Sequence, residues 1–247
     1  MPLEQFREYP TKLAASKLSS DLLDHISDTS EDEAALEEQI HLLSGPAPAF
    51  DTLLGKQKTA TAADIGTATH AFLEFCDFEN FSSAGIDAEI SRLIEKRFLS
   101  PETADLINRD QLNLFLKSRV MKWILDAEKI YKEQQFNLSV PLSALTASKE
   151  KQTDPLYQNE TVLVQGSIDL LLRMKDGQLV LIDYKTDHVS LAESKDFSLL
   201  QKSMTEKHVN QLSCYALAVK RMFGRIPNAS YIYSLPLGTE IPIEVLM

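Results

Sequence analysis

The chain is organised around one stretch, Thr161 to Asp187, which reads TVLVQGSIDLLLRMKDGQLVLIDYKTD. Apolar residues dominate 162–172 and 179–182, and short apolar runs bounded by turn residues are typical of β-strands. Between the runs lies Lys-Asp-Gly at 175–177, which fits a three-residue hairpin loop because glycine adopts a positive φ without steric cost. The stretch therefore predicts an antiparallel hairpin that carries charged residues where apolar ones would be ordinary.

The predicted loop sets which residues of the two strands lie opposite each other. Met174 pairs with Gln178, and in the same register Asp169 lies directly across from Asp183. Lys185 is two residues beyond Asp183 and therefore on the same face. Opposed residues have Cβ atoms about 4.5–5.5 Å apart, so two bare carboxylates there would repel each other. A two-residue loop would instead slip the register by one residue and place the aspartates on opposite faces.

A divalent cation between the two aspartates would remove this repulsion. Oxygen ligands at about 2.0–2.1 Å suit Mg²⁺, which usually keeps several waters and completes its shell with substrate phosphate. The ammonium of Lys185 could orient such a water and stabilise negative charge on a phosphate. The alternative is an exposed sheet face on which these side chains simply meet water, and the pattern by itself does not decide between the two.

Composition sets limits on the partners of this chain. The 247 residues suffice for one large domain or two small ones, with a sizeable core. The net charge of −11 disfavours tight unaided binding to DNA, since no strong basic stripe is present. Much of this charge is local, because residues 21–38 hold eight acidic residues and no Lys or Arg.

Several other classes of protein do not fit the sequence. No apolar run approaches 18 residues, and the start MPLEQFREYP is unlike a signal peptide, so we expect a cytoplasmic protein without membrane contact. Cys76 and Cys214 are far apart and fit reduced thiols, and two cysteines cannot hold an iron–sulphur cluster by themselves. No phosphate-binding Gly-x4-Gly-Lys-Ser/Thr loop is present, so no ATP site is expected in this chain.

The chain pattern predicts two parts. Residues 1–60 read as a linker or helical lead-in with the acidic run, and 61–247 as one domain with a helical part (61–132) and an α/β core (133–247). Expected elements are a helix capped by Asp64, helices over 87–98 and 101–130, a strand from about Glu133, a helix opened by Ser203 and Glu206 and closed by Gly224, and strands at 229–234 and 241–246.

Two helices carry further polar residues. The motif GTATH places His70 on the first helix of the domain, four residues before Glu74. We interpret Glu74 as structural. In the helix after the hairpin, Gln211 and Tyr215 are also four apart and share a face. A lone helical histidine is more often structural than functional, so the order of these motifs matters more than any one of them.

Four short motifs, GTATH, QGSID, DYKTD and QLSCY, occur in the same order as the motifs of the nucleases that this chain resembles, the RecB- and AddA-type nucleases of the PD-(D/E)XK superfamily. The resemblance implies an α/β (α+β) fold with a restriction-endonuclease-like core, a mixed central sheet and flanking helices. It implies that His70, Asp169, Asp183 and the Tyr184 carbonyl hold Mg²⁺ or Mn²⁺. In that family the lysine acts in catalysis, here Lys185, and the Gln-x-x-x-Tyr pair, here Gln211 and Tyr215, holds the DNA backbone or positions the site.

One segment departs from the family pattern. Residues 132–136 read Lys-Glu-Gln-Gln-Phe where AddA-type sequences have Arg-Glu-x-Pro-Phe, so only Glu133 and Phe136 match. Glu133 is therefore a weak candidate for the site, and a role in a salt bridge is at least as well supported.

The resemblance implies a DNA exonuclease or endonuclease domain of an ATP-dependent helicase–nuclease complex for double-strand break repair. Its partners would be single-stranded DNA, helicase domains of the same polypeptide and an AddB/RexB-type subunit. The helicase domains are implied because KLAASKL at 12–18 is similar to the segment that joins them to the nuclease. The alternative is a catalytically silent nuclease fold that serves as a DNA channel or a docking surface for a partner.

Overall fold

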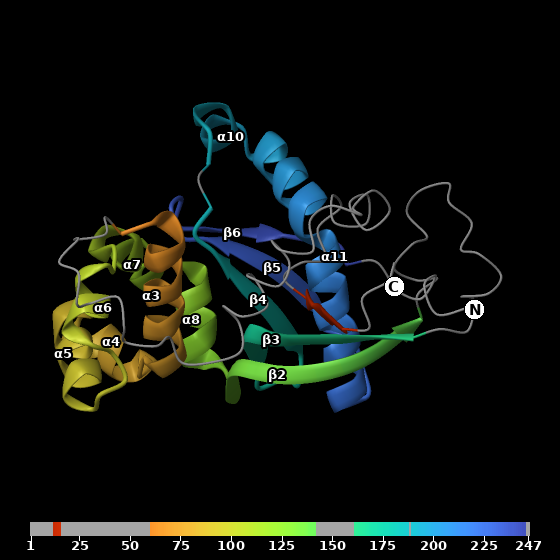
Figure 1. Ribbon diagram of the computed structural model, residues 1–247, viewed down its shortest axis with the longest axis horizontal. Helices are drawn as coiled ribbons and strands as arrows, with labels where there is room; N and C mark the ends of the chain where they lie inside the picture. The colour runs from red at the N-terminus through yellow and green to blue at the C-terminus, as the bar shows by residue number, and fades with distance from the viewer. Residues whose placement is uncertain (1–11, 16–59, 142–160, 188, 246–247) are drawn as a thin grey trace, which may run out of the picture.

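The computed structural model describes residues 12–15, 60–141, 161–187 and 189–245 (Figure 1). The helices of the described residues are α3 (Ala62–Phe75), α4 (Phe78–Ala84), α5 (Ile86–Glu95), α6 (Pro101–Asp105), α7 (Arg109–Leu116), α8 (Arg119–Asp126), α10 (Leu191–Lys195) and α11 (Phe197–Phe223). The strands are β1 (Lys12–Ala14), β2 (Lys129–Pro141), β3 (Thr161–Arg173), β4 (Leu179–Lys185), β5 (Ala229–Ser234) and β6 (Thr239–Pro242).

The six strands form one mixed sheet. Its order is β1-β3-β4-β5-β6, and β2 pairs with the other edge of β3 along its whole length. The pairs β2–β3, β3–β4 and β5–β6 are antiparallel, whereas β1–β3 and β4–β5 are parallel. A mixed sheet with flanking helices confirms the fold class that the sequence predicts.

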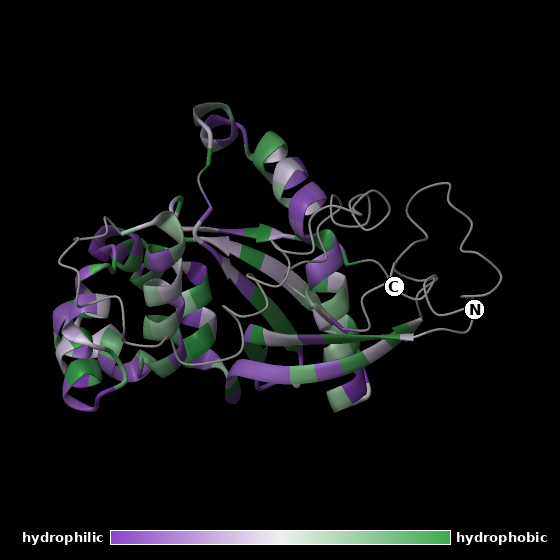
Figure 2. Cartoon of the chain, viewed as in Figure 1, coloured by the Kyte–Doolittle hydropathy of each residue, from purple (hydrophilic) through white to green (hydrophobic). Residues whose placement is uncertain are grey.

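Different helices cover the two faces of the sheet. Helices α3 to α8 gather on one side (Figure 1), where Leu170, Leu172 and Ile182 join their apolar residues in one core. Leu171 and Leu181 point the other way and pack against α11. The helices carry both hydrophilic and hydrophobic residues (Figure 2), as expected for helices with one buried face.

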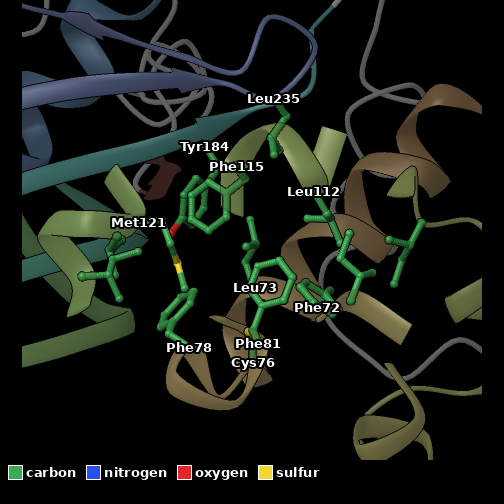
Figure 3. Packing of buried hydrophobic residues seen from close by; sticks show 14 of the residues in the cluster. Phe72, Leu73, Cys76, Phe78, Phe81, Leu112, Phe115, Met121, Tyr184 and Leu235 are labelled. Atoms are coloured by element: carbon green, nitrogen blue, oxygen red, sulfur yellow. The ribbon is translucent and has the colours of Figure 1, made fainter. Parts of the chain in front are cut away.

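The core beneath α3 to α8 is rich in aromatic side chains. In Figure 3 Tyr184 of β4 lies beside Phe115, and their ring centroids are 5.7 Å apart at an interplanar angle of 83°. Phe72 and Phe81 make a similar edge-on contact at 5.4 Å. Because Tyr184 is anchored in this cluster, strand alternation turns its neighbours Asp183 and Lys185 to the opposite face.

The predicted hairpin is confirmed. Gly177 has φ 84°, and the backbone N–H of Met174 donates to the carbonyl of Gln178 at 2.8 Å, so residues 175–177 form the loop. The ladder pairs Leu170 with Ile182 and continues to the loop in that register. In this register the next pair would be Asp169 with Asp183, beyond the last regular pair of the ladder.

Several expected boundaries are wrong. The last helix of the region expected to be helical over 101–130 ends at Asp126, and β2 begins at Lys129 rather than near Glu133. Residues 129–132 belong to the sheet because they pair with the end of β3, where Tyr131 lies opposite Leu171. The strand expected at 241–246 is instead β6, which begins at Thr239 and ends at Pro242.

Two helix starts also differ from expectation. Thr61 is the N-cap of α3, and Asp64 is the third residue of the helix, where its carboxylate returns the bond in a capping box. Helix α11 starts at Phe197 with Asp196 as its cap, two turns before the expected Ser203. The added turns are stabilised by packing, because Leu200 and Met204 are buried against residues of β5 and β6.

The first 60 residues differ in part from the predicted linker or helical lead-in. Residues 12–14 form β1, parallel to β3 with Leu13 beside Val164. The other expectations for this segment, including the acidic run at 21–38 and the joining segment beyond Ala15, lie outside the described residues.

Candidate active site

Three neighbouring strands bring acidic residues together. Strands β2 and β3 keep one register, with Lys132 opposite Leu170 and Gln134 opposite Ile168, so Glu133 stands opposite Asp169. The regular ladder omits this one pair, and Glu133 has φ 44°. A positive φ is a strained conformation for a residue with a side chain, and such strain persists only where the surroundings impose it.

The inside–outside alternation of β3 also changes at this point. Val164 and Ile168 pack on the α11 side, and so does Leu171, although strict alternation would send it to the opposite side from Ile168. Leu170 lies in the core beneath α3 to α8. The strand therefore changes phase next to Asp169, which turns this carboxylate out of the regular pattern.

Helix α3 supplies the nitrogen of the cluster. His70 Nδ1 lies 3.7 Å from Asp169 Oδ2 and 4.0 Å from Glu133 Oε1. One ligand atom from each of these three residues lies within 4.8 Å of the others. An imidazole and two carboxylates that converge in this way form a donor set suited to a divalent cation.

A second polar chain runs beside this cluster. Lys185 Nζ lies 2.7 Å from Asp183 Oδ2 and donates to Gln211 Oε1 at 3.0 Å. The amide of Gln211 in turn donates to the hydroxyl of Tyr215 at 2.7 Å. The side chain of Asp183 is 1% exposed and that of Lys185 17%, so α11 holds a charged pair away from most solvent.

The cluster is electrostatically strained as it stands. Burial raises the pKa of Asp169 well above its ordinary value, and the carboxylates of Asp183 and Glu133 raise it further. Lys185 and the backbone N–H of Tyr184, which donates to Asp169 Oδ2 at 2.7 Å, oppose this only in part. The three carboxylates share one ammonium, that of Lys185, and a bound metal ion would relieve the repulsion that remains.

The histidine and the lysine respond differently to burial. Burial lowers the pKa of His70 overall, although Asp183 and Glu133 act against it, so the neutral imidazole that binds metals is favoured. Burial also lowers the pKa of Lys185, but Asp183 and Asp169 outweigh it and raise the pKa overall. Lys185 therefore stays protonated at neutral pH and, in the protein without metal or substrate, cannot accept a proton as a base.

The structure groups the predicted residues unequally. His70 and Asp169 join the three-residue donor set, whereas Asp183 lies beside it, paired with Lys185. Tyr184 lies between, with its N–H on Asp169 and its ring in the core. Gln211 and Tyr215 lie behind Lys185 and contact it directly or through each other.

The motif comparison leaves Glu133 open, yet the sequence holds a signal for it. Phe136 pairs with Gly166, and a Cβ on Gly166 would lie 2.8 Å from the Phe136 ring. Glu133 is three residues before Phe136, and Asp169 is three residues after Gly166. Aligning the bulky residue with the glycine across an antiparallel pair would have placed Glu133 opposite Asp169.

A second glycine sets the approach of α3. A Cβ on Gly66 would lie 3.0 Å from Thr186 Oγ1, so the helix lies close to the residue that follows Lys185. Glycine in the word GTATH thus allows His70, one turn further along, to reach the end of β4. Nearby, His208 Nε2 lies 3.5 Å from Asp187 Oδ2, and this contact lowers the pKa of Asp187.

Comparison with known families assigns this arrangement to a class. The family model for the PD-(D/E)XK nuclease superfamily matches residues 36–240, and the chain belongs to that superfamily. The chain is accordingly a nuclease-type hydrolase domain. It is 34% identical over 195 residues to an ATP-dependent helicase/nuclease subunit of Clostridium beijerinckii, a match that covers 77% of this chain and 15% of that protein.

Other relatives carry the same name. The ATP-dependent helicase/nuclease subunit of Clostridium botulinum strain Loch Maree is 28% identical over 236 residues, or 95% of this chain and 17% of the relative. That of Clostridium novyi is 27% identical over 190 residues, or 76% and 14%. The chain thus spans less than a fifth of the length of these relatives.

Among the helices that the structure describes, none is both long and apolar enough to cross a membrane.

Proposed function

We propose that this chain is the nuclease domain of a helicase–nuclease subunit of the AddA type and that it hydrolyses DNA phosphodiester bonds with Mg²⁺ or Mn²⁺, as an exonuclease. The observation that carries the proposal is the convergence of His70, Glu133 and Asp169 ligand atoms within 4.8 Å beside the Asp183–Lys185 pair. The family assignment supports the same chemistry.

In this proposal His70, Glu133 and Asp169 hold the cation, with Asp183 and the Tyr184 carbonyl as further oxygen donors. A divalent cation supplies Lewis acidity toward the phosphate and lowers the pKa of a bound water. Lys185, fixed by Asp183 and Gln211, faces the negative charge that develops on the phosphate. Tyr215 keeps the Gln211 amide oriented toward Lys185.

Single-stranded DNA is the proposed substrate, delivered by motor domains elsewhere in the polypeptide, and an AddB/RexB-type subunit is the proposed partner in the cytoplasm. The names of the relatives and the small share of their length that the chain covers support this. The net charge of −11 is consistent with a site that receives its strand from a motor rather than capturing it unaided.

The test is cleavage of labelled single-stranded DNA with Mg²⁺ or Mn²⁺ by wild type and Asp183→Ala. We expect metal-dependent cleavage in wild type and its loss in the variant, with an unchanged circular dichroism spectrum. Asp176→Asn is the matched control, because Asp176 is an exposed aspartate in the loop of the same hairpin. Cleavage by Asp183→Ala at the wild-type rate would refute the assignment of the site.

A further inference from the structure

The C-terminal end of α3 lacks a cation of its own. The helix carries His70 and ends at Phe75, with Cys76 as its C-cap, and its last turn holds no basic residue. The last carbonyls of a helix have no partner within the helix, and positive charge near them is stabilising. The cation at this end therefore has to come from another element.

Lys132 of β2 supplies it. Its Nζ donates to the Cys76 carbonyl at 2.7 Å and lies 5.2 Å from the centre of the Phe78 ring. Burial lowers the pKa of Lys132, and Asp77 and Glu74 act against this. A half-buried ammonium at a helix terminus, in contact with an aromatic face, is a specific arrangement rather than a solvated surface lysine.

The next residue on the strand is Glu133, whose φ of 44° interrupts the β2–β3 ladder. Such a conformation is strained and must be imposed by the contacts around it. On one side of Glu133 the Lys132 side chain is fixed to α3, and on the other the ladder resumes at Gln134. The strained residue thus lies between two fixed neighbours, Lys132 held by the end of α3 and Gln134 held by β3.

From these contacts we propose that Lys132 is the positioning residue of the metal centre. It ties the strand that carries Glu133 to the helix that carries His70, and so sets the separation of these two donors from Asp169. The proposal rests on the proposed function, because it assumes that these donors bind a metal ion.

The experiment measures Mn²⁺ binding by calorimetry without DNA, and amide hydrogen exchange with chelator present. We expect Lys132→Met to weaken Mn²⁺ affinity by about 10–100-fold, the usual effect of losing a residue that orients metal ligands. Exchange at 72–77 and 130–135 should accelerate in the same variant. Lys132→Arg keeps the charge and the donor, and should recover most of the affinity.

Lys129→Met is the matched control. Lys129 lies on the same strand, is exposed and stands 4.9 Å from the Tyr131 ring, a contact that stays within β2 and does not reach α3. We expect wild-type affinity and exchange from it. If Lys132→Met does not melt cooperatively, Lys132→Gln takes its place, with the same expected losses.

The outcomes separate the two proposals. Wild-type Mn²⁺ affinity in a folded Lys132→Met variant, or equal losses in Lys129→Met, would overturn the positioning role. Failure of wild type to bind Mn²⁺ would overturn the proposed function, and the positioning role with it. Faster exchange in Lys132→Met would then still show that the lysine ties β2 to α3.

Discussion

Two buried carboxylates in this protein have opposite electrostatic surroundings. Glu89 of α5 is fully buried and accepts hydrogen bonds from the Asp77 N–H at 2.6 Å, from the Asn80 amide and from Arg92. Burial by itself raises the pKa of Glu89, but these donors lower it overall. Asp169, with 9% of its side chain exposed, has one backbone donor in Tyr184 and faces other carboxylates, and its pKa is raised.

Under the proposed function, the difference separates a structural charge from one that serves the metal site. Around Glu89 the helical part of the fold provides as many hydrogen-bond donors as the carboxylate can use, so the charged group stabilises the folded state. Around Asp169 the sheet leaves negative charge unmatched and accepts strain at Glu133 as well. A fold retains such a cost where function requires it, and under the proposed function a bound cation would remove it.

The largest expected effect follows from neutralising the functional charge. Asp169→Asn should reduce metal-dependent DNA cleavage by about 10³-fold or more, the scale of losing a preorganised charge in an active site. In the presence of chelator the same variant should be at least as stable as wild type, because a repulsion is removed. Cleavage kinetics and urea denaturation measure the two effects. Loss of both activity and metal-free stability would mean that Asp169 is structural, like Glu89.

The matched change at the structural charge should do the reverse. Glu89→Gln leaves Arg92 half-buried without its anion, and removing one partner of a buried pair costs roughly 3–5 kcal/mol. We expect urea denaturation to show this loss, while cleavage per folded molecule stays at the wild-type level. A specific loss of cleavage in a variant of normal stability would contradict the division between the two carboxylates.

The contrast also shows which features local sequence can predict. The hairpin register was predictable because Gly177 fixes the loop and strand alternation fixes the faces, and both depend on neighbouring residues. Gly224 at the end of α11 was predictable for the same reason, as a left-handed cap. The start of α11 was not, since its first turns depend on Leu200 packing against distant strands.

The site divides in the same way. Asp169, Asp183 and Lys185 lie within one hairpin, so its register brings their positions in the chain together, whereas the phase change of β3 that turns the Asp169 carboxylate was not predictable from it. Glu133 belongs to β2 and stands opposite Asp169, 36 residues further along the chain, so its place depends on that pairing. In the part of the chain that the structure describes, His70 of α3 lies 4.0 Å from the Glu133 carboxylate, a contact that the sequence around Glu133 could not reveal.

A metal ion should erase part of the contrast between the two carboxylates. We expect Mg²⁺ or Mn²⁺ to raise the melting temperature of wild type, because a ligand at 100 times its dissociation constant stabilises by about 2.7 kcal/mol. Asp169→Asn should lose most of this shift, whereas Glu89→Gln should keep it from its lower starting point. Differential scanning fluorimetry with Ca²⁺-free buffers and a chelator blank measures it. An equal shift in all three proteins would indicate binding elsewhere.

The smallest effect is the dependence of metal-free stability on pH, where the two groups act with opposite sign. Asp169 binds protons more tightly in the folded state than in the unfolded one, so its contribution to stability rises as pH falls through its raised pKa toward the ordinary 3.8. Glu89 has a lowered pKa, so its contribution is present above the ordinary 4.5 and is lost as pH falls through the folded value. Each unit of pKa difference corresponds to about 1.4 kcal/mol.

Urea denaturation with chelator should therefore give a stability that increases on mild acidification and then falls. Asp169→Asn should remove the increase, and Glu89→Gln should weaken the fall. An increase that persists in Asp169→Asn would assign the uncompensated charge to another residue of the cluster.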